Sequence, residues 1–197
     1  MKHVLIVHGW GNTRAHNHWQ RHLAGELRKQ GYGVHYPQLP ETETPNFADW
    51  AEVLIAELEM IAEVAKPGSE VVVVAHSLGC STWLRLAMDG LLPQKIDRLL
   101  LVAPADNAML ADVPSFIIEP TPLVRDALKA SSKQVFLLAS DADVWNPKGI
   151  HETYGAPLEI TPIVIEGAKH LALSDGWGRW QGVIDWVSDP TADLTVR

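Results

Sequence analysis

The chain has 197 residues, 47% of them hydrophobic and 20% charged, which is an ordinary composition for a single globular domain. Its formal net charge of −8, with no cluster of Lys and Arg, disfavours nucleic acid as a partner because phosphates would be repelled. No segment approaches the roughly 20 apolar residues of a membrane span. The one cysteine, Cys80, has no partner for an intramolecular disulfide, so we expect a reducing, cytoplasmic location.

Short β-branched runs alternate with longer amphipathic stretches along the chain, a pattern typical of parallel strands joined by helices. The predicted strands are residues 4–7, 33–36, 70–75, 96–102, 134–139 and 161–165. The predicted helices, with apolar residues at spacings of three and four, are residues 19–29, 47–64, 78–88, 123–130 and 177–187. The sequence therefore predicts an α/β fold of about six mostly parallel strands flanked by helices.

Two segments depart from this alternation. Prolines at positions 114, 120 and 122 interrupt the connection 104–132, which is longer than most crossovers and is expected to border a substrate pocket. Residues 189–197 follow the last predicted helix and are expected to be a frayed tail. Because no repeat or linker divides the rest, we expect one domain over residues 1–188.

A sharp turn is predicted at Ala75-His76-Ser77-Leu78-Gly79, between the most apolar strand and a helix. A serine in this setting is typical of a nucleophile elbow, which needs very small residues two positions away on either side. Ala75 and Gly79 qualify, although the consensus has Gly at the first position. The alternative is that Ser77 only caps the helix. The whole motif favours a nucleophile, with the Leu78 N–H as one oxyanion donor.

In this architecture the serine is followed along the chain first by an acid and then by a histidine, each after the end of a strand. Only His151 and His170 come after Ser77. His170 lies on the loop after the last predicted strand, whereas His151 follows no strand. We therefore expect His170 to be the general base.

Three aspartates are candidates for the acid that orients this base. Asp141 and Asp143 follow the strand at 134–139, and Asp106 follows the strand before it. Asp143 is favoured because the later position lets the loop reach toward the histidine before Pro147 redirects it. Asp141 has the alternative role of a turn or cap residue.

The loop His8-Gly9-Trp10-Gly11 directly follows the first predicted strand. Hydrolases with a nucleophile elbow place a second oxyanion donor in such a loop, so the Trp10 N–H is the predicted donor. Its glycines let the backbone approach a ligand closely, although glycines after strands also occur simply in turns.

A cluster of histidines raises the alternative of a metal site. His16, His18 and His22 lie close in sequence, and the last two are four residues apart on a predicted helix. The segment lacks the Glu of a His-Glu-x-x-His site and has no nearby third ligand. Exposed helix histidines are therefore the preferred interpretation, and neither a metal nor another cofactor is expected.

Together these motifs resemble the small serine hydrolases related to retinoblastoma-binding protein nine and bacterial YdeN. The matching segments are 7–10, 18–20, 74–80, 102–104 and 140–143, together with His170. The resemblance implies an α/β-hydrolase fold without a large lid and a triad that maps onto Ser77, Asp143 and His170. Many members carry Asp-Pro where this chain has Asp143-Val144, a departure that bears on the acid and on the pocket walls.

The sequence favours hydrolysis of a carboxylic ester of a small molecule by acyl transfer. One alternative is a binding or scaffold protein on the same fold with weak or no catalysis, because the family's association with protein partners points to one here, and fold does not fix function. Another is cleavage of an amide or peptide, which a triad alone does not distinguish from ester hydrolysis. Chemical activation of the serine separates the first alternative from an enzyme.

Overall fold

The computed structural model describes residues 1–197 and contains one parallel sheet. Six strands lie in the order β2-β1-β3-β4-β5-β6, and each neighbouring pair is parallel. Their bounds are β1 (Lys2–Val7), β2 (Gly33–His35), β3 (Glu70–His76), β4 (Ile96–Val102), β5 (Ser132–Ser140) and β6 (Ile163–Ile165). The predicted α/β fold is confirmed, and the predicted strand ends differ from these by at most two residues.

Helices join the strands. Their bounds are α1 (Trp19–Lys29), α2 (Phe47–Val64), α3 (Leu78–Met88), α4 (Pro122–Ser131), α5 (Ala156–Leu158) and α6 (Gln181–Ser188). The first three match the predicted ranges, whereas α6 begins four residues later than predicted, after the left-handed Gly176. A π-helical turn, His151–Gly155, runs into α5 and was not predicted. None of the helices combines the length and the apolar composition that a membrane span needs.

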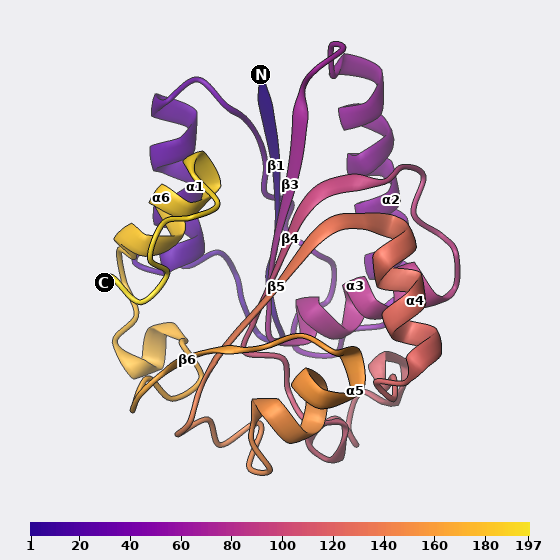
Figure 1. Cartoon of the computed structure of the whole chain (residues 1–197), viewed down its shortest axis with the longest axis vertical. Coiled ribbons are helices and arrows are strands. Elements are labelled where there is room, and N and C mark those ends of the chain that lie inside the picture. The colour runs from indigo at the N-terminus through magenta and orange to yellow at the C-terminus, as the bar shows by residue number, and fades with distance from the viewer.

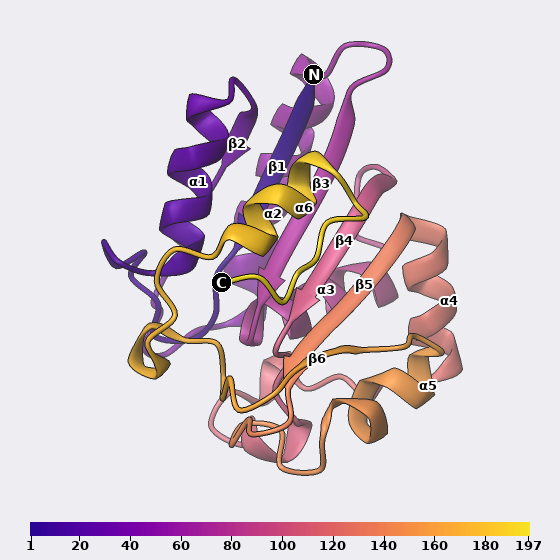
Figure 2. The same ribbon diagram turned by 60° about the vertical axis from the view of Figure 1, so that its left-hand side comes forward.

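The helices cover both faces of the sheet (Figures 1 and 2). Val72 and Val74 of β3 pack in one apolar cluster with residues of α1 and α6. Val71, Val73 and Ala75 point to the other face and pack in a second cluster with residues of α2, α3 and α4. Because alternate residues of the strand are buried on opposite faces, the strand reads as a continuous apolar run.

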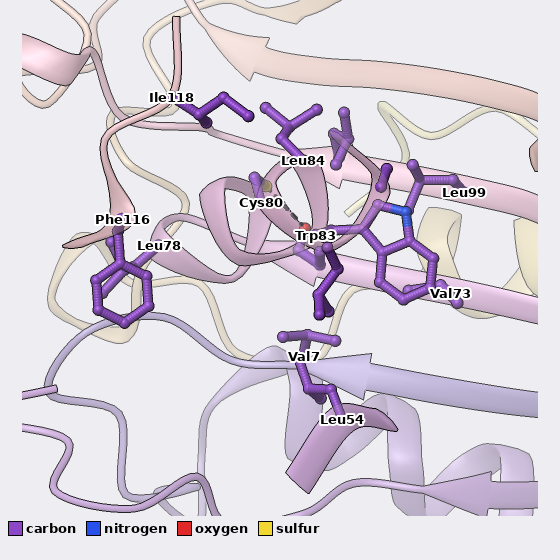
Figure 3. Packing of buried hydrophobic residues seen from close by; sticks show 14 of the residues in the cluster. Val7, Leu54, Val73, Leu78, Cys80, Trp83, Leu84, Leu99, Phe116 and Ile118 are labelled. Atoms are coloured by element: carbon purple, nitrogen blue, oxygen red, sulfur yellow. Dashed lines mark hydrogen bonds between the residues drawn. The ribbon is translucent and has the colours of Figure 1, made fainter. Parts of the chain in front are cut away.

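Helix α3 is held at the centre of the second cluster (Figure 3). Trp83 and Cys80 are fully buried, and the Trp83 indole lies beside the strand residues Val73 and Leu99. The Cys80 thiol donates weak hydrogen bonds to the Ala75 and Val102 carbonyls, each at 3.4 Å, and its burial raises the pKa of the thiol. The N-terminal end of α3 is therefore fixed relative to β3.

The segment 189–197, expected to be frayed, lies against α6. Leu194 is buried, and the Trp180 indole N–H donates to its carbonyl oxygen at 2.9 Å. The Gly182 N–H donates to the Val196 carbonyl at 2.7 Å. The segment is short and mostly polar, so the burial of its one leucine in the apolar cluster was not apparent from the sequence.

This packing predicts a specific effect of Gly182→Ala. The added methyl would lie 2.6 Å from the Asp193 carbonyl oxygen, so the tail must shift, and we expect a loss of about 1–3 kcal/mol in the free energy of unfolding. Gly25→Ala on α1 is the matched control, because nothing lies within 4 Å of its added methyl and the helix gains up to ~1 kcal/mol. Urea unfolding and carboxypeptidase digestion measure stability and tail release; unchanged values for Gly182→Ala would contradict this packing.

Candidate active site

The loops that carry the predicted site residues meet at one edge of the sheet. Because the strands are parallel, their carboxyl ends share that edge, at the bottom of Figure 1. Trp10 follows β1, Ser77 follows β3, Asp143 follows β5 and His170 follows β6. The topology therefore brings together residues that are up to 160 positions apart in the chain (170 minus 10).

Ser77 lies in a strained turn. Its φ of 54° and ψ of −124° lie outside the regions that non-glycine residues normally adopt. The turn brings α3 against the end of β1, so that a methyl group on Gly79 would lie 2.8 Å from the His8 carbonyl oxygen. The Ser77 side chain makes no capping hydrogen bond to α3. The helix-cap alternative therefore does not explain this serine.

Three side chains form one hydrogen-bonded line. The Ser77 Oγ lies 2.8 Å from the His170 Nε2, and the His170 Nδ1 lies 2.9 Å from both carboxylate oxygens of Asp143. Asp143 and His170 are both buried, and the Trp145 N–H also donates to Asp143, at 2.9 Å. An aspartate that accepts the Nδ1–H leaves the lone pair of Nε2 facing the serine hydroxyl, which is the arrangement of a general base.

The other candidates have different partners. Asp141 accepts the Gly167 N–H at 2.7 Å, so it joins the loop after β5 to the loop after β6. Asp106 accepts the Ala108 N–H at 3.1 Å and pairs with the Lys148 ammonium at 3.1 Å. His151 is exposed at the start of the π-helical turn. None of the three makes a hydrogen bond or ion pair with Ser77 or His170.

The loop after β1 packs closely against Ser77. A methyl group on Gly9 would lie 2.8 Å from the Ser77 Cβ, so only glycine permits this approach. Neither the Trp10 N–H nor the Leu78 N–H donates to a backbone carbonyl in the loops and turns around it. Leu78 is the first residue of α3, where the N–H has no partner within the helix. Both predicted oxyanion donors are thus unused.

A cluster of buried imidazoles, which the sequence did not predict, lies beside the serine. The His76 ring lies 5.8 Å from the His18 ring and 5.2 Å from the His170 ring, and the His76 Nε2 donates to the His170 carbonyl oxygen at 2.9 Å. The His8 Nε2 accepts the Leu39 N–H at 2.9 Å. The motifs His8-Gly9 and His76-Ser77 contained two of these residues, but nothing in them indicated burial.

The histidines of the former metal hypothesis do not converge. His16 is exposed, whereas His18 is buried and its Nδ1 accepts the Gln20 N–H at 3.2 Å, which caps α1. The expectation that His18 is an exposed helix residue was wrong, because its ring packs beside the rings of Trp19 and His76. No three His, Cys, Asp or Glu side chains are grouped as metal ligands.

Two small cavities reach Ser77 and His170. One, of about 260 Å³, includes Ala105 and Leu110 from the irregular connection 104–132, which therefore borders the site as expected. The other, of about 230 Å³, includes His18 and His76.

A parallel sheet with helices on both faces, and a serine on the sharp turn after an inner strand, define an α/β hydrolase. The protein-family model for serine hydrolases matches residues 4–189, and the chain belongs to this family. No curated protein sequence matches the chain.

Solved structures show the same fold at low sequence identity. The ydeN gene product from B. subtilis is 21% identical, with a TM-score of 0.78 over 95% of this chain and 97% of that chain. A YdeN-like hydrolase from Pectobacterium atrosepticum is 18% identical, with a TM-score of 0.73 over 95% and 89% of the two chains. Est1E from Butyrivibrio proteoclasticus, solved with ferulic acid, is 14% identical, with a TM-score of 0.61 over 89% and 86%. The predicted resemblance to YdeN-type hydrolases is confirmed.

The buried imidazoles predict a loss of stability in mild acid. Burial lowers the pKa of His8 and of His18 from 6.5 to about 4 and that of His76 well below 6.5. The unfolded chain therefore binds protons first as the pH falls below about 6.5, and stability is lost from there toward pH 4.

Urea unfolding at pH 7.5 and 5.5 measures this loss, which should be on the order of 1 kcal/mol for each of the three groups. His18→Asn, which keeps a side chain suited to the helix cap, should reduce the difference, whereas the exposed His16→Asn should not. Equal stability at the two pH values would contradict burial of neutral imidazoles.

Proposed function

We propose that the chain hydrolyses a carboxylic ester of a small molecule through Ser77, His170 and Asp143, with an acyl-enzyme intermediate. The observation that carries the proposal is the 2.8 Å contact between the Ser77 Oγ and the His170 Nε2, made by a serine held in a strained turn. A serine hydroxyl is a weak nucleophile until a neighbouring base takes its proton. Membership of the serine hydrolase family supports the same chemistry.

In the first half-reaction, the His170 Nε2 takes the proton from Ser77 as the Oγ attacks the ester carbonyl carbon. The oxyanion is bound by the Trp10 and Leu78 N–H groups, which have no other partner in their loops. Collapse breaks the bond to the alcohol oxygen, which leaves with the proton from His170. Water then repeats these steps on the acyl-enzyme and releases the carboxylic acid and free Ser77.

Asp143 acts on the ring of His170 rather than on the substrate. Its carboxylate accepts the Nδ1–H, which fixes the tautomer with a free lone pair on Nε2, and it stabilises the imidazolium that forms during each half-reaction. The His76 Nε2–H holds the backbone carbonyl of His170, which supports the position of the same ring. The Asp143 carboxylate and the His76 N–H both bind His170 at atoms other than Nε2, and so they favour the geometry that the base needs.

A binding protein without catalysis explains this geometry less well. A strained non-glycine residue costs on the order of 1–3 kcal/mol, and binding alone needs neither that turn nor an aligned base. The fold neighbours support ester hydrolysis too: one is a structure with ferulic acid bound, and another is described as a carboxylesterase.

A fluorophosphonate probe should label the protein at Ser77, because the base and donors that favour attack on a carbonyl also favour attack on phosphorus. Ser77→Ala should abolish labelling. Ser174→Ala, which changes another serine of the same cavity, should leave labelling intact. Mass spectrometry of the labelled peptide identifies the site; intact folded protein that does not react would favour the binding-protein alternative.

Asp143→Asn should lower kcat by about 10⁴-fold, the size of effect seen when the acid of a triad is made neutral. Asp141→Asn and Asp106→Asn should have much milder effects, because their oxygens accept backbone N–H groups that an amide oxygen also accepts. Steady-state kinetics on a soluble ester, with circular dichroism to verify folding, compares the three. A larger loss for Asp106→Asn would move the acid to the loop after β4.

A further inference from the structure

The two cavities that meet at Ser77 differ in chemistry. Both are bordered by Trp10, Gly11, Ser77, His170 and Ala172. No Asp, Glu, Lys or Arg side chain lines either of them. Each is smaller than the roughly 300 Å³ that begins the range of pockets for drug-sized ligands. Each therefore suits one small, uncharged half of a substrate.

The cavity of about 260 Å³ is apolar away from the serine. Its remaining walls are Leu78, Ala105, Leu110 and Trp145. The indoles of Trp10 and Trp145 lie 6.2 Å apart between ring centroids and are tilted by 58°, so they form one side of it. Such walls offer contact to a hydrocarbon or aryl group. The only side chains there with a free hydrogen-bonding group are Ser77, His170 and Trp145, because the Trp10 indole N–H already donates to the Glu43 carbonyl oxygen at 3.0 Å.

The cavity of about 230 Å³ has polar walls, among them Asn12, Thr13, His18 and Ser174. His18 is only 5% exposed, and its Nδ1 accepts the Gln20 N–H, which places the ring proton on Nε2. That Nε2–H donates to no group of the protein. The atom is nevertheless not fully enclosed by protein, so a ligand can reach it. A buried donor with a fixed tautomer therefore borders this cavity with its hydrogen bond unused.

We propose that the substrate is an uncharged ester with an apolar acyl group in the cavity of Trp145 and a hydroxyl-bearing alcohol in the cavity of His18, where the His18 Nε2–H donates to an alcohol hydroxyl. This rests on the ester hydrolysis proposed above. The acyl group stays bound through both half-reactions, so it gains most from the apolar cavity. The alcohol must leave after the first, and its cavity opens to solvent past the exposed Thr13 and Ser174.

The test compares glycerol 1-monobutyrate with propyl butyrate, which share an acyl group and differ by two hydroxyls on the alcohol. The wild type should have the higher kcat/KM for the monobutyrate. His18→Asn keeps a side chain able to cap α1 but is too short to place a donor in the cavity. It should lower the ratio of the two kcat/KM values by about 3- to 10-fold, the effect of one uncharged hydrogen bond. His16→Asn, on the exposed neighbour, is the control.

Measuring which half-reaction His18→Asn slows distinguishes a loss of alcohol binding from a general structural defect. Both esters give the same butyryl-enzyme, so His18→Asn should act on acylation and not on the deacylation rate constant. Ala105→Leu, which fills the other cavity, should instead lower kcat/KM for butyrates relative to acetates of the same alcohol. The reverse pattern, or an unchanged ratio for His18→Asn, would overturn this assignment.

The two proposals fail in different ways. If the wild type hydrolyses p-nitrophenyl acetate and propyl butyrate but shows no preference for the monobutyrate, only the assignment of the cavities is overturned. If it hydrolyses none of these esters and does not react with a fluorophosphonate, the ester hydrolysis itself is overturned.

Discussion

The geometry of the site depends on one turn, in which Ser77 is held with a left-handed φ between β3 and α3. Strain of this kind persists only where the surroundings determine the backbone more strongly than the residue's own preference does. Here the packing of the core determines the backbone. The buried Trp83 fixes the position of α3, and Gly79 lets the backbone of the helix contact the backbone at the end of β1. The packing of the apolar core thereby fixes the position of the Ser77 hydroxyl group.

The partners of that hydroxyl are fixed by contacts between loops rather than by secondary structure. Asp141 joins the loop of Asp143 to the loop of His170, and the Asp175 carboxylate accepts the His170 N–H at 3.1 Å. His76 holds the carbonyl of the same residue. The backbone of His170 is therefore bound at both its N–H and its C=O, so the ring has few ways to leave the line between Ser77 and Asp143.

Much of this arrangement could be predicted from the sequence. The turn at Ser77 is a local motif, and Asp143 and His170 come later in the chain, each after a recognisable strand. The burial of His18 could not be predicted, since the local sequence of a histidine at the start of a helix is the same whether distant residues such as His76 or water surround its ring. The π-helical turn at 151–155 was hidden because Gly155 and Pro157 normally argue against a helix. The packing of Leu194 depends on a long-range contact with Trp180 that no local pattern records.

The position of Cys80 bears on how the protein responds to chemical stress. Its sulfur faces two backbone carbonyls inside the core, and burial disfavours the thiolate, which is the form that reacts with electrophiles and peroxides. The chain has no other thiol. Alkylating reagents and oxidants therefore find no cysteine to modify unless the core opens first, so modification of the Cys80 thiol would report unfolding rather than a change at the serine.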